Sequence, residues 1–254
     1  MEATASNSLA AAQWQARVDL AAAHRLAVIY GYHEAIDNHF TLLLPGHDDR
    51  FLLAPHGLHW SEVRASDLMV VGTDGTIHEG EGLVEDTAFF IHAPIHAGPR
   101  KIRCVLHTHM PYATALSMLD EPELLMASQN AIAFYGQMAV CDYNGFALGR
   151  DEGERMAAAL GAGSVLLLRN HGVVTTGASV AEAFNSLYFF ERAAQTQLIA
   201  QASGRPLRLV PDEVLAATAA QYVEAEKVGE DERIHLHFAA LKRILDRREP
   251  DYAS

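Results

Sequence analysis

The clearest chemical signal in this sequence is a pair of histidines, His107 and His109, two positions apart in the run KIRCVLHTH (residues 101–109). The run predicts a buried strand, and because side chains alternate along a strand, both imidazoles point to the same face. Such a pair can bind one divalent cation at about 2.0–2.1 Å per nitrogen without distorting the backbone. An isolated pair of this kind is more often structural, so a third ligand decides the interpretation.

His171 is the candidate for that third ligand. It closes a second strongly apolar run, SVLLLRN, and is followed by Gly172. Two buried strands that end in histidines predict a cluster at one edge of the sheet, where functional groups commonly collect.

A competing pair, His92 and His96, has the four-residue spacing that also supports a metal on a helix. Pro94 lies between the two histidines, however, and the glutamate of an HExxH motif is absent. We therefore predict that these two histidines pack the helix against the sheet, or form hydrogen bonds that hold the metal ligands in place.

Length and charge narrow the class of protein. The chain has 254 residues and a net charge of −13, with 50% hydrophobic residues. The length and hydrophobic content predict one globular domain over residues 1–254. The negative net charge disfavours a nucleic-acid partner, because its electric field repels phosphates. No apolar run reaches the ~20 residues of a membrane span, and the N-terminus lacks the pattern of a secretory signal. The expected location is the cytoplasm.

The predicted elements alternate in a way that suits one α/β domain. A helix is expected from a cap at Asn7 or Ser8 to about Tyr30, and Ser179 begins a capping box for a helix that runs to Gly204. The other expected segments are strands at 39–44, 50–54, 67–72, 76–80, 101–109, 137–143 and 164–172, and helices at 85–96, 111–119, 151–160, from 211, and at 231–246. Paired short strands around Gly/Asp turns predict a largely antiparallel sheet.

Several of these segments resemble the class II aldolase/adducin family. The strings CVLHTHMPYATALS and LLLRNHGVVTTG are similar to its two metal-binding segments. Supporting similarity covers nearly the whole chain, in IYGYHEAIDNHFTLLLPG, APHGLHWSEVRASDLMVVGTDG, CDYNGFAL and HFAALKRILDR.

The resemblance implies a three-layer α/β/α fold around an antiparallel sheet, and a homotetramer. It also implies one divalent cation on His107, His109 and His171, with zinc expected and Mn²⁺, Co²⁺ or Fe²⁺ as alternatives. A small-molecule substrate would bind there, with the cation acting as a Lewis acid.

The sequence departs from the aldolases of this family at their acid/base glutamate, whose place is taken by Ala88. Alanine cannot transfer a proton, so the candidate replacements are Glu85, Asp86, Tyr143, His56 or a tyrosine of a neighbouring subunit. The candidate substrate-binding residues are Asn38, His56, Gly57 and Thr87. An acidic residue at 86 would repel a phosphate, which favours a non-phosphorylated substrate.

These features support competing functions. The first is a metal-dependent lyase that cleaves or decarboxylates a small hydroxy- or oxo-acid through a metal-stabilised enolate, with an epimerase as a variant on the same scaffold. The second is a non-catalytic interaction protein similar to the adducin head domain, which Ala88 favours. A third is an oligomer that zinc stabilises without any chemistry.

Overall fold

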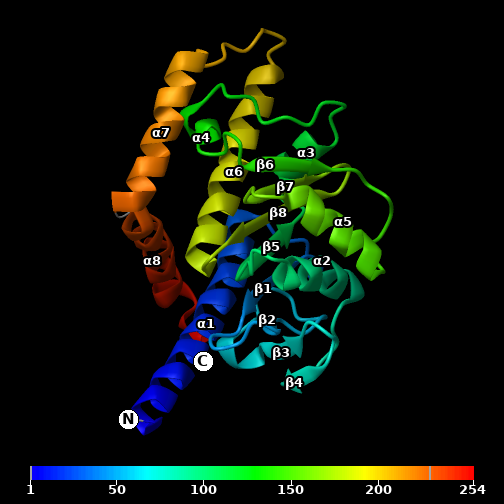
Figure 1. The fold of residues 1–254 in the computed structure, drawn as a ribbon, viewed down its shortest axis with the longest axis vertical. Coiled ribbons are helices and arrows are strands. Elements are labelled where there is room, and N and C mark those ends of the chain that lie inside the picture. Colours follow the sequence, from blue (N-terminus) through cyan, green and yellow to red (C-terminus); the bar gives the residue numbers. More distant parts are fainter. Residues whose placement is uncertain (1, 229) are drawn as a thin grey trace.

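The computed structural model describes residues 2–228 and 230–254. A single sheet of eight strands lies at its centre, in the order β4-β3-β2-β1-β5-β8-β7-β6 (Figure 1). All neighbouring strands are antiparallel except β6 and β7. The strands are β1 His39–Leu43, β2 Arg50–Leu53, β3 Met69–Gly72, β4 Ile77–Glu79, β5 Cys104–Thr108, β6 Met138–Cys141, β7 Val165–Leu168 and β8 Gly172–Gly177. The prediction of a largely antiparallel sheet is confirmed.

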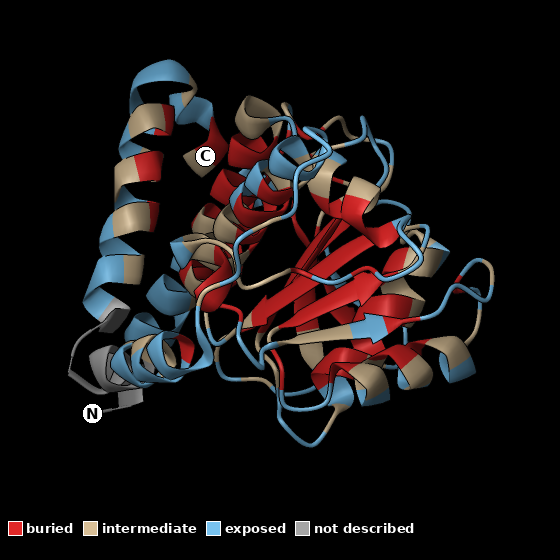
Figure 2. Ribbon diagram, turned by 90° about the horizontal axis from the view of Figure 1, so that it is seen from above, coloured by how far each residue is buried: buried red, intermediate tan, exposed pale blue. Residues whose placement is uncertain are grey.

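Helices cover both faces of this sheet. They are α1 Glu2–Tyr30, α2 Asp86–Ala97, α3 Pro111–Ser117, α4 Gln129–Ile132, α5 Arg150–Leu160, α6 Val180–Gln201, α7 Asp212–Val228 and α8 Glu230–Arg248, with short 3₁₀ turns at Ala65–Asp67 and Pro250–Ala253. Helices α2 and α5 lie against one face, while α1, α3 and α6 lie against the other and α8 packs outside α1 and α6. Figure 2 shows the buried strands between the two helical layers. Among the described residues, none of the helices has both the length and the hydropathy to cross a membrane.

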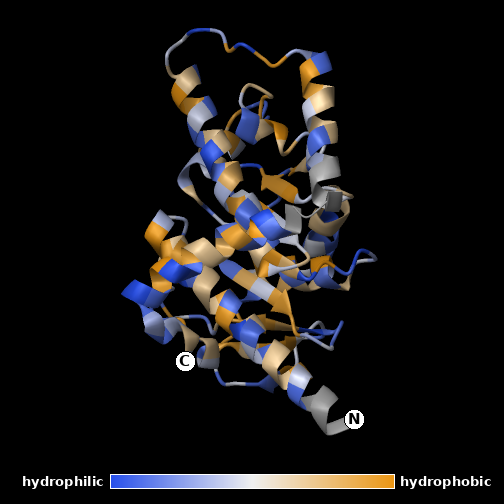
Figure 3. Ribbon diagram, turned by 90° about the vertical axis from the view of Figure 1, so that its left-hand side faces the viewer, coloured by the Kyte–Doolittle hydropathy of each residue, from blue (hydrophilic) through white to orange (hydrophobic). Residues whose placement is uncertain are grey.

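The alternation of side chains along β5 shows how the layers are built. Cys104 and Leu106 belong to the larger core, with residues of α1, α3 and α6, whereas Val105 packs with Ile91 and Leu166 in the core beneath α2 and α5. Figure 3 shows hydrophobic residues concentrated in the strands, while the helices carry both hydrophobic and hydrophilic residues. His107 follows Val105 by two positions, so it lies on the α2 side of the sheet.

Several predicted boundaries differ from the structure. Helix α1 begins at Glu2, so neither Asn7 nor Ser8 is its N-cap, and α6 ends at Gln201 rather than Gly204. Ser179 is confirmed as the N-cap of α6, since its hydroxyl accepts from the Glu182 N–H at 3.2 Å. The predicted capping box is not complete, because the Glu182 carboxylate accepts from the Ala178 N–H at 2.8 Å. The run 164–172 is not one strand: β7 ends at Leu168, and residues 169–171 form the turn of a hairpin with β8. His171 thus stands in a turn, and His109 lies one residue beyond β5.

Helices α2 and α5 approach each other most closely at Gly153 of α5. Pro94 has no N–H to donate to the carbonyl of Phe90, four residues earlier, and α5 passes directly over that carbonyl. A β-carbon placed on Gly153 would lie 1.8 Å from the Phe90 oxygen and 2.8 Å from Pro94 Cγ. Only a glycine allows the two helices to come this close.

We expect Gly153→Ala to lower the free energy of unfolding by about 3 kcal/mol, because the methyl group can be accommodated only by moving a helix backbone. Urea unfolding followed by circular dichroism measures this change. Gly149→Ala is the matched control, since a β-carbon there has no atom within 4 Å. Equal stability of the two variants would contradict the packing described.

Candidate metal centre

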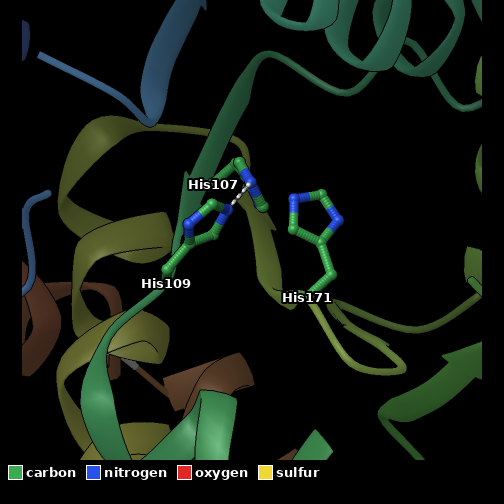
Figure 4. Close-up of side chains that lie close together, drawn as sticks. All are labelled: His107, His109 and His171. Atoms are coloured by element: carbon green, nitrogen blue, oxygen red, sulfur yellow. Dashed lines mark hydrogen bonds between the residues drawn. The ribbon is translucent and has the colours of Figure 1, made fainter. Parts of the chain in front are cut away.

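Three histidines converge at the end of β5 beside the β7–β8 turn. One ring nitrogen from each of His107, His109 and His171 lies within 4.8 Å of the other two (Figure 4). The two Nε2 atoms of His107 and His109 are 3.1 Å apart. His107 is supplied by β5, His109 by the residue that leads into α3, and His171 by the hairpin turn. Hydrogen bonding between β5 and β8, with His107 opposite Val174, brings these segments together.

The outer nitrogens of two of these rings are held by hydrogen-bond acceptors. His107 Nδ1 donates to the Val173 carbonyl at 3.1 Å, and His109 Nδ1 lies 2.7 Å from a Glu34 carboxylate oxygen. Both rings therefore carry the proton on Nδ1 and direct an Nε2 lone pair inward. A carboxylate or carbonyl behind a ligating imidazole is the usual arrangement in metal sites, because it fixes the ring and its tautomer.

This arrangement suits a cation. Two Nε2 lone pairs that face each other at 3.1 Å repel unless a positive charge lies between them. Zinc binds imidazole nitrogens at about 2.0–2.1 Å, so one ion can reach both atoms. Burial, and then the neighbouring His171, holds the pKa of His107 well below its usual range. Burial and His109 lower the pKa of His171 to about 4. The imidazoles of His107 and His171 are therefore neutral near pH 7, the form that binds metals.

The other candidate residues gather only in part. Asn38, His56 and Glu85 line one small cavity together with Ala88, and Glu85 also caps α2. Its Oε2 accepts from the Thr87 hydroxyl at 2.5 Å and from the Ala88 N–H at 2.6 Å. Burial would raise the pKa of Glu85, but these hydrogen bonds bring it below its ordinary value.

The remaining candidates lie in more open positions. Tyr143 is 47% exposed, and its ring centroid is 6.2 Å from that of His171. Asp86 is exposed in the first turn of α2, and Gly57 is exposed with a φ of 103°. Their roles in catalysis and binding stay predictions.

The competing pair His92 and His96 is fully buried on α2. Neither belongs to the triad, the only such metal-ligand cluster found among the described residues. Both form hydrogen bonds with β1: His92 with His39 and Thr41, and His96 with Thr41. This arrangement agrees with the predicted packing or supporting role.

Sequence reasoning missed Glu34 and His39. Glu34 stands 75 positions from His109, so no local spacing links the two. For His39 the sequence did contain a signal, because a histidine stands at the first position of the predicted strand 39–44. Only the register between β1 and β5, which places His39 opposite His107, shows that it belongs to the site.

We expect Glu34→Gln to weaken metal affinity about 10–100-fold, because a neutral amide stabilises the His109 ring less than a carboxylate does. Competition with a chromophoric chelator measures the affinity. Asp37→Asn, an exposed change in the same loop, is the control, and an unchanged affinity in Glu34→Gln would show that the pair has no role in binding.

A family model described as "Class II Aldolase and Adducin N-terminal domain" matches residues 18–198 of this chain. The chain therefore belongs to the class II aldolase/adducin family, as the sequence motifs predicted. The alpha-adducin of Rattus norvegicus is 34% identical over 91% of this chain, which spans 33% of that longer protein.

Solved structures agree with this assignment. An aldolase II superfamily protein from Pseudomonas syringae is 39% identical, with a TM-score of 0.87 over 96% of both chains. The L-fuculose 1-phosphate aldolase from Glaciozyma antarctica PI12 has a TM-score of 0.83 over 96% of this chain and 94% of its own. At 24% identity, that second likeness concerns the fold. The predicted class II aldolase fold is confirmed.

Proposed function

We propose that this protein is a metal-dependent carbon–carbon lyase that carries out retro-aldol cleavage or decarboxylation of a small, non-phosphorylated hydroxy- or oxo-acid. The observation that carries the proposal is the inward convergence of three imidazoles, two of them with tautomers fixed from behind. Three neutral ligands leave the full charge of a divalent ion available, and at least one coordination position open.

When bound, a divalent ion would supply Lewis-acid stabilisation of the negative charge that develops on a substrate oxygen as the bond breaks. His107, His109 and His171 would hold it, and Glu34 and the Val173 carbonyl would keep two of the rings in place. Zinc is the ion we propose. A cytoplasmic location and a tetrameric assembly are proposed from the family resemblance.

Because Ala88 cannot transfer a proton, this step needs another side chain. Glu85 is half-buried in the cavity that Ala88 also lines, and its lowered pKa keeps it in the carboxylate form, which is the form a general base needs. Tyr143 lies on the His171 side and carries a hydroxyl that could donate one. We propose Glu85 and Tyr143 as the acid/base pair, while Asp86 is the weaker candidate because it is exposed.

A second candidate function is a binding role without catalysis, which Ala88 and the 34% identity to an adducin favour. Metal would then stabilise the fold without turnover.

One experiment separates the two. Purified protein is analysed for metal by mass spectrometry, then screened against hydroxy- and oxo-acids with and without chelator. The lyase proposal predicts about one divalent ion per chain and turnover that the chelator abolishes. Stoichiometric metal without turnover on the panel would favour the binding role, and a chelator-insensitive reaction would contradict the proposed mechanism.

A further inference from the structure

A continuous line of hydrogen bonds runs between the sheet and α2. It starts at the carbonyl of Ile102, 2.7 Å from His96 Nδ1, and continues from His96 Nε2 to the Thr41 hydroxyl at 2.8 Å. The same hydroxyl lies 2.5 Å from His92 Nδ1, and His92 Nε2 lies 2.7 Å from His39 Nδ1. The side chains of Thr41, His92 and His96 are fully buried and that of His39 is 7% exposed.

The direction of every hydrogen bond in this line is determined by its first member. A carbonyl only accepts, so His96 Nδ1 donates to Ile102, and a neutral His96 must then accept at Nε2. The single hydroxyl hydrogen of Thr41 is donated to His96 at 2.8 Å rather than to the Val105 carbonyl, which lies 3.5 Å away. Thr41 therefore accepts from His92 Nδ1. His92 Nε2 accepts in turn from His39 Nδ1. Burial lowers the pKa of His96 to about 4, so its imidazole is neutral.

The line ends at a cavity with unused hydrogen-bonding groups. His39 Nε2 is left with a lone pair and lies 4.0 Å from Glu85 Oε2, too far for a hydrogen bond, so two acceptors face one space. Asn38 lines the same cavity, and its amide is oriented by the His109 N–H, which donates to Oδ1 at 3.1 Å. Asn38 Nδ2 is thereby left as a buried donor without a partner.

The size of the cavity agrees with this set of groups. Its volume of ≈ 20 Å³ is room for about one water-sized group. A hydroxyl donates one hydrogen bond and accepts others, so it can take the donor of Asn38 and one of the two acceptors. Near pH 7 a phosphate group is mostly the dianion, which has no hydrogen to donate, and the Glu85 carboxylate repels it.

We propose that the buried line of hydrogen bonds fixes His39 as its Nδ1–H tautomer, so that His39 Nε2, Glu85 and Asn38 bind a hydroxyl group of the substrate and exclude a phosphate. His39 is the group that touches the substrate, whereas Thr41, His92 and His96 are positioning residues. The substrate part of this inference rests on the proposed lyase function, while the tautomer does not.

The tautomer is measured directly by long-range ¹H–¹⁵N NMR of zinc-loaded protein with ¹⁵N-labelled histidine, with His39 assigned from the spectrum of His39→Gln. We expect His39 to be the Nδ1–H tautomer in wild type and in Thr41→Ser, which keeps the hydroxyl. Thr41→Val breaks the line and is expected to give a mixture of tautomers at His39 with unchanged metal content. An Nε2–H or doubly protonated His39 in wild type, or a Thr41→Val spectrum like that of wild type, would overturn the assignment.

Hydroxyl recognition is tested with two probes, glycerate and 3-phosphoglycerate, titrated calorimetrically into zinc-loaded protein. We expect glycerate to bind at least about tenfold more tightly, and Glu85→Gln to reduce that ratio severalfold because the repulsive charge is gone. Glu81→Gln, which removes an exposed neighbouring carboxylate, is the matched control and should keep the wild-type ratio.

A ratio of one or less in wild type, or no measurable binding of glycerate, would overturn the hydroxyl site. Neither measurement depends on turnover. A substrate screen that finds no lyase activity would therefore contradict the proposed function and leave the tautomer and the binding preference to be judged by these results.

Discussion

His107→Ala is expected to retain less than about a tenth of the divalent metal that wild type binds, and to lose about 10³-fold or more of any metal-dependent turnover. The imidazole of His107 is almost fully buried, and its Nε2 is 3.1 Å from that of His109. Without it only His109 and His171 remain, and two imidazoles are fewer than the three or four protein ligands of stable zinc sites. His109→Ala and His171→Ala are expected to lose most of the metal as well.

Metal content is measured by mass spectrometry after dialysis against a known free zinc concentration, with circular dichroism to confirm folding. His78→Ala removes an exposed histidine on β4, near the far edge of the sheet, and should bind metal as wild type does. Full occupancy in any one of the three ligand variants would remove that histidine from the set of ligands.

The metal-free protein is expected to lose about 4 kcal/mol of stability between pH 6.5 and pH 4.5 through two buried histidines, His24 and His96. Burial lowers the pKa of each to about 4 from an ordinary value of 6.5. Between these two values the unfolded chain binds more protons than the folded one, so the stability contribution is complete above pH 6.5 and is lost as the pH falls toward 4. Each histidine contributes about 2 kcal/mol over the stated interval.

Urea unfolding at a series of pH values measures this loss. His24→Leu isolates one contribution, because His24 packs between Phe40 and Trp60 with one backbone hydrogen bond, to Leu20. Between pH 6.5 and pH 4.5 the free energy of unfolding of His24→Leu should fall by about 2 kcal/mol less than that of wild type. A parallel pH dependence in the two proteins would show that His24 is not buried in its neutral form.

The sequence predicted that His107, His109 and His171 lie together because their signals were local and repeated. Two apolar runs each ended in histidine, and an antiparallel sheet needed only to bring those ends together. Segment types were predicted well for the same reason, since β-branched and leucine-rich runs of four to six residues between turns leave few alternatives. The boundary at His171 was wrong because a hairpin turn of three polar residues between two apolar runs looks like one long strand.

The supporting groups could not be predicted in this way. Glu34, Thr41 and His39 act through contacts with residues 51 to 75 positions away, which depend on strand register and on the depth at which α2 lies. That an alanine stands at 88, where the family resemblance implies a glutamate, was visible in the sequence. The sequence did not show that Glu85 and His39 line the same cavity as Ala88. His39 begins β1 and Glu85 caps α2, and only the packing of α2 on the sheet brings the two side chains together.

The contact at Gly153 sets the position of helix α2, which carries several of the residues behind the site. Glu85 caps α2, and His92 and His96 lie along its buried side. Helix α5 packs against the Phe90 carbonyl, to which Pro94 cannot donate. A displacement of α5 by a few tenths of an ångström would be passed through this backbone contact to the whole line of hydrogen bonds behind the site. Directed evolution toward a new substrate could therefore find useful changes on α5, in residues that never meet the substrate.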